Sequence, residues 1–158
     1  MFNELMLRDA LPSDAKVISK LILPLTEKYV VPDCLPEGQI QLRNAMSEAA
    51  VAGYIAVGMD YQLLFSAAKE LVGVVAMKDN RHLYHLFVAE SYHGQGLAGK
   101  LWQVAKARCM ANGNTGNFTV NSALSAEPVY LKFGFQRVAG IRERAGIRDI
   151  PMQLNINR

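Results

Sequence analysis

The chain has 158 residues and a mass of 17.4 kDa, with 51% hydrophobic and 20% charged residues. That length is typical of one domain that buries roughly 68–70% of its unfolded surface, and the composition excludes a collagen, a coiled coil and a disordered chain. A net charge of +3 is too mild to indicate nucleic acid, whose binders gather basic residues on one face. We therefore expect a single domain over residues 1–158 that does not bind nucleic acid.

The cysteines and the most apolar stretch bear on where the protein works. Cys34 and Cys109 lack the spacing of a metal or redox site, so we expect buried or half-buried thiols, no metal and a cytoplasmic location. The N-terminus lacks the apolar core of a signal peptide. Residues 49–68 are almost long enough to span a membrane, but Asp60 interrupts them. A helix that runs into a buried strand is the better interpretation, and we expect no membrane contact.

The first 60 residues are mainly helical by pattern. Residues 3–8 are predicted to form a strand, and a helix with Ser13 as its N-cap follows. Pro24 is expected to end or kink that helix, because proline removes a backbone donor. A second helix is predicted from about Gly38, and a turn or short third helix around 47–58.

The remaining chain alternates strands and helices. Residues 61–67, 71–77 and 82–88 are separated by short polar turns, which predicts an antiparallel meander of three strands. In the predicted helix 95–111, Trp102, Ala105 and Cys109 have the spacing of a buried face. The other expected elements are a strand at 118–121, a helix at 126–133, and strands at 135–143 and 148–156.

A glycine-rich loop lies between the strand 82–88 and the helix 95–111. It reads His93-Gly-Gln-Gly-Leu-Ala-Gly99, and converging backbone N–H groups at a helix start form an anion site. The alternative is a tight loop without a ligand. A dinucleotide fingerprint is rejected, because five residues separate Val88 from Gly94, no acidic residue lies near 119, and too little chain follows Gly99.

Two segments together resemble the GNAT superfamily of acyl-CoA-dependent N-acyltransferases: LFVAESYHGQGLAGKL at 86–101 and PVYLKFGF at 128–135. In that family the pyrophosphate loop reads [Arg/Gln]-x-x-Gly-x-[Gly/Ala]. Gly96 and Ala98 match its fourth and sixth positions, whereas His93 departs from the first. Tyr130 holds the position of a family tyrosine four residues before Gly-Phe. The motifs cover residues 60–158, and the element order covers the whole chain.

The resemblance implies an α+β fold, an α/β/α sandwich around a mostly antiparallel sheet of about seven strands. One splayed strand pair would hold acetyl-CoA, with no metal. Many members carry an asparagine ahead of the tyrosine; this chain has Ala123 there and Asn121 two residues earlier, and the asparagine's role is not transferred to Ala123. The expected cofactor-binding residues are Leu86, Phe87 and Val88 on the strand, His93, Gly94, Gln95, Gly96, Leu97, Ala98 and Gly99 in the loop, and Asn121 and Tyr130.

The resemblance also implies direct attack by an amine on the thioester. Tyr130 is the candidate acid for the departing thiolate, against a purely packing role. His82 is the candidate base, against a surface or turn histidine. Strand alternation would place His82, Tyr84, Leu86 and Val88 on one face and Leu83, His85 and Phe87 on the other. Weaker candidates are Glu70, Glu90 and Glu143 as bases, and Lys100, Lys106 and Lys132 as CoA phosphate partners or solvated residues.

Two functions are compatible with these residues. The first is a cytoplasmic N-acetyltransferase that acts on a primary amine of a small molecule or peptide. The alternative, favoured by His93 and Ala123, is a non-catalytic acyl-CoA-binding or interaction module. The acceptor pocket would lie between residues 13–58 and the final hairpin. The arginine-rich face of that hairpin is expected to be solvated or to face a second copy in a homodimer.

Overall fold

The computed structural model describes residues 4–156, which form an eight-stranded mixed sheet in the order β1-β2-β3-β4-β5-β8-β6, with β7 paired to β8. Only β4 and β5 pair in parallel. The strands are β1 (Met6–Asp9), β2 (Asp60–Phe65), β3 (Leu71–Lys78), β4 (His82–Val88), β5 (Asn117–Ser122), β6 (Gln136–Arg137), β7 (Arg142–Arg144) and β8 (Ile147–Asn155).

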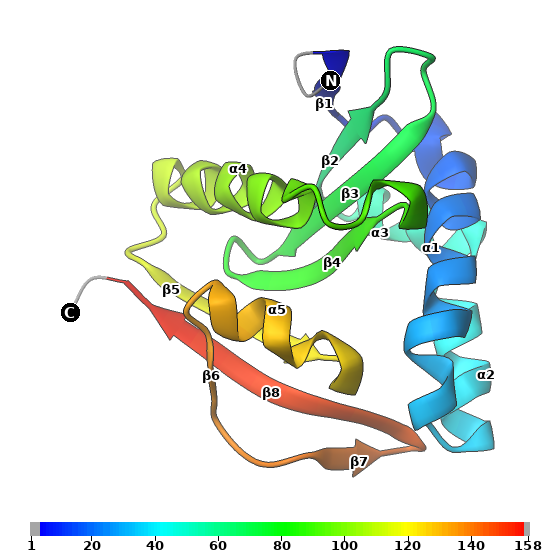
Figure 1. The fold of residues 1–158 in the computed structure, drawn as a ribbon, viewed down its shortest axis with the longest axis vertical. Coiled ribbons are helices and arrows are strands. Elements are labelled where there is room, and N and C mark those ends of the chain that lie inside the picture. The colour runs from blue at the N-terminus through cyan, green and yellow to red at the C-terminus, as the bar shows by residue number, and fades with distance from the viewer. Residues whose placement is uncertain (1–3, 157–158) are drawn as a thin grey trace.

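Helices cover both faces of this sheet (Figure 1). On one face, α4 and α5 pack on a core that includes Trp102 and Phe118; on the other, α1 and α3 pack on a second core around Ile18 and Leu63. The expected α/β/α sandwich is therefore confirmed. The helices are α1 (Ala15–Tyr29), α2 (Pro36–Ala45), α3 (Glu48–Ala56), α4 (Leu97–Ala111) and α5 (Glu127–Lys132), with short 3-10 turns at η4 (Glu90–Tyr92) and η5 (Leu124–Ala126).

The first helix differs from its prediction at both ends. Ser13 lies in a 3-10 turn, and the N-cap of α1 is Asp14, whose carboxylate accepts a hydrogen bond from the Leu11 N–H and pairs with Arg8. Pro24 lies inside α1, which continues to Tyr29, so the expectation of an end at Pro24 is wrong. Proline removes one helical hydrogen bond. The burial of Ile22 before Pro24 and Leu25 after it outweighs that loss.

The meander of β2, β3 and β4 is confirmed as antiparallel. The apolar stretch 49–68 becomes most of α3, a turn and β2, as predicted. Within residues 4–156, no helix has the length and apolar character needed to cross a membrane. Trp102, Ala105 and Cys109 are buried as expected, and both cysteines are buried and free.

The predicted strand 135–143 is instead two short strands, β6 and β7, which accounts for the eighth strand. Val138 donates its N–H to the carbonyl of Pro151 on β8, but Pro151 has no N–H to return. The ladder therefore stops after Arg137. The chain leaves β8 and pairs with it again at Arg142.

A bulge interrupts β4. Ala76 of β3 pairs with His85 and Met77 pairs with Leu83, so Tyr84 is an extra residue in the ladder. Leu83 shares a core cluster with Val88, whereas Tyr84 bonds to Tyr54 of α3. The predicted alternation is therefore wrong in this strand, because one extra residue shifts every side chain beyond it to the other face.

Candidate functional site

The strands β4 and β5 form the opening of the site. They pair only where His82 and Leu83 meet Thr119 and Val120, and beyond that they diverge, as Figure 1 shows. The expected splayed pair is therefore present. A cavity of about 370 Å³, the central cavity, lies where they diverge. Its walls come from β4, β5, α5, the end of α1, α2 and the start of β8.

A second hollow of about 370 Å³, the loop cavity, lies against residues 92–98 and the start of α4. The two cavities adjoin, because six residues line both of them. An elongated ligand can therefore pass from the glycine loop into the interior between β4 and α5. The shared residues are Leu86, Val88, His93, Ala126, Val129 and Tyr130.

The glycine loop has the backbone that an anion site needs. Gly94 and Gly96 have φ values of +80° and +76°, a region that other residues occupy at a cost. A Cβ added at either glycine would meet no protein atom within 4 Å, so both face open space. Gly96 is the N-cap of the 15-residue helix α4, whose first N–H groups lack helical partners and carry positive partial charge.

The side chain of His93 is hydrogen-bonded to the end of β4. Its Nε2 lies 2.7 Å from the carbonyl oxygen of Val88, and because a carbonyl only accepts, Nε2 carries a proton and donates it. The ring also packs near Tyr29, with centroids 6.1 Å apart. His93 therefore fastens the loop to the end of β4, and the side-chain contact that the sequence could not assign is a structural one.

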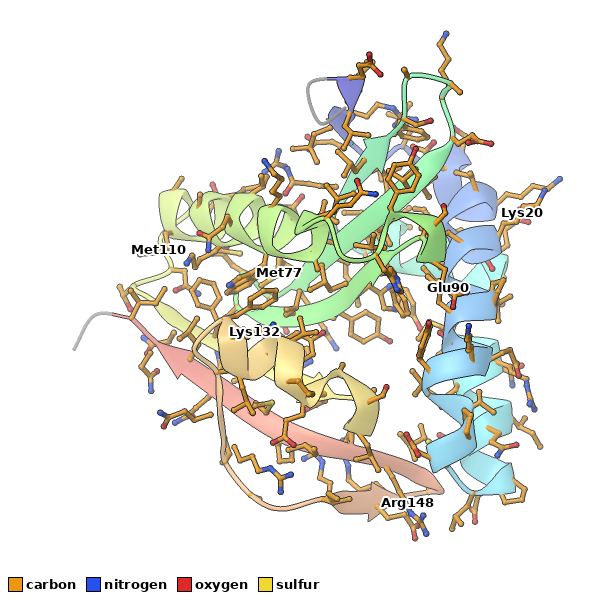
Figure 2. All side chains as sticks on the ribbon, in the orientation of Figure 1. Lys20, Met77, Glu90, Met110, Lys132 and Arg148 are labelled. Atoms are coloured by element: carbon orange, nitrogen blue, oxygen red, sulfur yellow. The ribbon has the colours of Figure 1, made fainter. Side chains whose placement is uncertain are left out.

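The end of α1 closes the site on the other side. Lys28 forms an ion pair with Glu90, and the Tyr29 hydroxyl donates to the same carboxylate at 2.7 Å. Figure 2 shows Glu90 beside α1. Ser125 of η5 donates to the Tyr29 carbonyl at 2.7 Å, so Tyr29 connects both sides of the opening. The Lys28 and Tyr29 hydrogen bonds lower the pKa of Glu90, which makes it a poor base.

Tyr130 of α5 lines both cavities and is 8% exposed. Its ring packs edge-on against Phe133 and Phe135. Within the described residues its hydroxyl has no hydrogen-bond partner, and burial raises its pKa. The phenol therefore stays protonated, with its proton available to a ligand between β4 and α5.

The structure does not bring His82 together with Tyr130. Its Nδ1 lies 2.8 Å from the Thr119 hydroxyl, at the closed end of the strand pair, and it lines neither cavity. Burial lowers its pKa, as do nearby lysine and arginine charges. Glu70 borders a separate hollow and Glu143 is exposed on β7. The lysines Lys100, Lys106 and Lys132 line neither cavity.

Asp149 on β8 was not predicted as a site residue. This carboxylate is 9% exposed, lines the central cavity, and accepts a hydrogen bond from Arg142 Nε at 2.6 Å. The expectation that this hairpin face is solvated is wrong for this residue. In the sequence, the feature that could have indicated Asp149 is that it is an acidic residue among the arginines of the hairpin. Figure 2 shows Arg148 near the start of β8, close to α2.

Two further residues of the central cavity, Tyr84 and His85, were not predicted as site residues. His85 is 2% exposed and its Nδ1 lies 2.9 Å from the Tyr61 hydroxyl. Burial lowers the pKa of His85 to about 3, so it is neutral at physiological pH.

Most of the predicted cofactor residues line one or both cavities: Leu86, Phe87, Val88, His93, Gly94, Gly96, Leu97, Ala98, Asn121 and Tyr130. Two do not. Gln95 borders a different hollow, and Gly99 lies in the first turn of α4.

The family model for the acetyltransferase (GNAT) domain matches residues 30–156. No curated protein matches the sequence.

Solved structures share the fold at low sequence identity. A GCN5-related N-acetyltransferase from Rhodopseudomonas palustris is 20% identical, with a TM-score of 0.79 over 96% of this chain and 95% of that one. The PaiA N-acetyltransferase of Thermoplasma acidophilum, solved with coenzyme A, is 15% identical, with a TM-score of 0.74 over 96% and 99%. A phosphinothricin acetyltransferase from Sinorhizobium meliloti, solved with acetyl-CoA, is 17% identical, with a TM-score of 0.65 over 96% and 89%.

Proposed function

Since this chain belongs to the GNAT acetyltransferase family, and is thereby an acyltransferase, we propose that it transfers an acetyl group from acetyl-CoA to a primary amine of a small molecule or peptide. The observation that carries this proposal is the junction of the two cavities at Leu86, Val88 and Tyr130. There a ligand bound to the glycine loop would reach a protonated phenol. The coenzyme A and acetyl-CoA complexes of two structural relatives support the choice of donor.

In the proposed complex, residues 93–99 bind the pyrophosphate. Backbone N–H groups and the N-terminus of α4 face it, and the glycines leave room for it. The pantetheine arm runs along β4 from Val88 toward Leu86, where β5 has diverged and does not pair with this edge. A backbone N–H on this edge would stabilise the oxyanion, a contribution of about 2.7–4 kcal/mol.

The reaction is a direct displacement. The amine nitrogen attacks the thioester carbonyl carbon, which forms a C–N bond and an oxyanion. Collapse of that intermediate breaks the C–S bond, and Tyr130 donates its proton to the departing thiolate. The proton lost by the amine leaves through the open cavity to solvent, and Tyr130 regains one from the same source. His82 is not assigned a step, because it lies outside both cavities.

A non-catalytic acyl-CoA-binding module is the second candidate. His93 is committed to Val88 and Ala123 replaces an asparagine that many members carry, so two side chains common in the family are lacking here. Tyr130 favours the enzyme, because a binding module has no need of an unpaired phenol at the cavity junction. The free buried cysteines support a reducing, cytoplasmic setting, and a homodimer remains a proposed assembly.

The test is acetyl-CoA turnover with a defined amine panel: 2-phenylethylamine, L-phenylalanine, putrescine, L-lysine and a lysine-containing peptide. We expect acetyl-CoA to raise the melting temperature, and at least one amine to release the thiol and form its N-acetyl product by mass spectrometry. A melting shift without thiol release from any amine would favour the binding module. Neither a shift nor turnover would contradict both candidates.

A further inference from the structure

The central cavity extends past Tyr130 into a region that the loop cavity does not share. We name it the acceptor chamber, and its residues come from α2, β4 and β8. Its walls are largely apolar. Of its charged residues, Asp149 accepts a hydrogen bond from Arg142 at 2.6 Å, and Arg148 also lines the cavity. The acceptor chamber is lined by Leu42, Met46, Tyr84, Ile147 and Asp149.

Tyr84 enters this chamber because of the bulge in β4. The extra residue interrupts the alternation, so Tyr84 and His85 both face α3, with ring centroids 4.6 Å apart. The same strand continues into Leu86 and Val88, which are proposed to hold the thioester. Tyr84 thus provides a hydroxyl on β4, two residues before Leu86.

A chain of two hydrogen bonds fixes the direction of the Tyr84 hydroxyl. Tyr54 of α3 donates to the carbonyl of Ala45 at 3.0 Å, and a carbonyl can only accept. The Tyr54 oxygen is then free to accept from Tyr84, and the two oxygens lie 3.2 Å apart. The Tyr84 proton therefore points away from the chamber, and its oxygen keeps lone pairs that can accept a bond there.

We propose that the Tyr84 oxygen accepts a hydrogen bond from the attacking amine and orients its lone pair toward the thioester. This inference rests on the proposed function. A primary amine supplies both an N–H for Tyr84 and a lone pair for the carbonyl carbon. Tyr54 is the positioning residue, since it acts through Tyr84 and lines neither cavity. Burial raises the pKa of Tyr84, in keeping with a phenol that orients the amine and does not remove its proton.

Two variants and a matched control test this role on the panel amine with the highest kcat/KM. Tyr84→Phe removes the accepting oxygen and should lower kcat/KM for the amine about tenfold, the effect of one hydrogen bond, with unchanged acetyl-CoA affinity. Tyr54→Phe leaves the Tyr84 proton free to turn into the chamber, and should lower the same constant. Tyr61→Phe removes a more deeply buried phenol hydroxyl that bonds to His85 and lines neither cavity, and should leave the constant unchanged.

The double variant Tyr54→Phe/Tyr84→Phe separates orientation from packing. If Tyr54 acts through Tyr84, the double variant should equal Tyr84→Phe, whereas independent structural damage would multiply the two losses and overturn the inference. An active wild type with Tyr84→Phe within twofold of it would also overturn the inference. A wild type that acetylates no panel amine would instead contradict the proposed function. A melting curve with acetyl-CoA shows that each variant is folded.

Discussion

His93 donates a hydrogen bond from Nε2 to the carbonyl oxygen of Val88 at 2.7 Å, and so joins the first residue of the glycine loop to the end of β4. The loop therefore keeps its place relative to the strand that would carry the pantetheine arm. The Nε2 atom of His93 is thereby engaged by the Val88 carbonyl. Backbone N–H groups and the N-terminus of α4 are then the principal anion donors of the loop.

We expect His93→Ala to weaken acetyl-CoA binding about 2- to 10-fold, because a loop that is no longer fastened to Val88 must be ordered by the ligand. His93→Gln is the matched variant, since its amide can donate to the same carbonyl and should keep affinity nearer to wild type. Isothermal titration calorimetry measures both. Equal affinity for wild type and His93→Ala would show that the hydrogen bond is dispensable for binding.

Tyr130→Phe should lower kcat about 10²- to 10⁴-fold, the usual contribution of general acid catalysis, if protonation of the thiolate limits the rate. The hydroxyl has no partner within the described residues, so its loss leaves no buried group unpaired, and the melting temperature should change little. Steady-state kinetics and a thermal melt test this together. A wild-type kcat beside a lowered melting temperature would leave Tyr130 as a packing residue.

His85 should make the protein less stable in acid. Its pKa is about 3 when folded and about 6.5 when unfolded, so between these values the unfolded state binds more protons. The free energy of unfolding should therefore fall as pH decreases from 6.5 toward 3, by at most about 1.4 kcal/mol per pH unit from this group.

The comparison of wild type with His85→Phe isolates this contribution, because His82 and the carboxylates are present in both. Urea unfolding at pH 7, 6, 5 and 4 should give a smaller slope for the variant, whatever its stability at pH 7. Parallel pH profiles for the two proteins would show that His85 is not held neutral by burial.

Gly38 marks where α2 meets the β7–β8 hairpin. A Cβ on Gly38 would lie 2.2 Å from the Gly146 backbone, and Leu35 donates to the Gly146 carbonyl at 2.8 Å. Gly38→Ala should therefore cost about 1–3 kcal/mol of the free energy of unfolding, as backbone must move. Gly53→Ala in α3 is the control: its Cβ meets nothing within 4 Å, and it should stabilise by about 0.5–1 kcal/mol. Equal urea midpoints would argue against the close contact.

The sequence predicted most of the fold where hydrophobic period and turn residues agree. The bounds of β4 match the predicted 82–88, and the helix at 95–111 was placed within two residues of α4. The glycine loop and Tyr130 could be named as candidates from motifs, because the spacing of those motifs is local. Both lie at the cavities, as expected.

Features that depend on distant partners were not predictable from local pattern. The bulge at Tyr84 is defined by pairing with β3, and the split of β6 from β7 depends on Pro151 in the neighbouring strand. His82 was placed by strand alternation and family position alone, which say nothing of where β4 and β5 begin to diverge. Asp149 lines the central cavity together with Leu42 of α2, an element far from β8 in sequence.

The most direct test of the account is acetyl-CoA binding to Gly96→Glu, measured by isothermal titration calorimetry beside wild type and Gly113→Glu. Both glycines have positive φ and open space around Cβ, so each substitution adds the same backbone strain and one negative charge; they lie at opposite ends of α4, where the helix dipole favours a carboxylate at Gly96 and disfavours one at Gly113. We expect Gly96→Glu to lose measurable binding while it remains folded, because its carboxylate would occupy the site and repel the pyrophosphate. Gly113→Glu should bind like wild type. Wild-type affinity in a folded Gly96→Glu would contradict the assignment of this loop to acetyl-CoA.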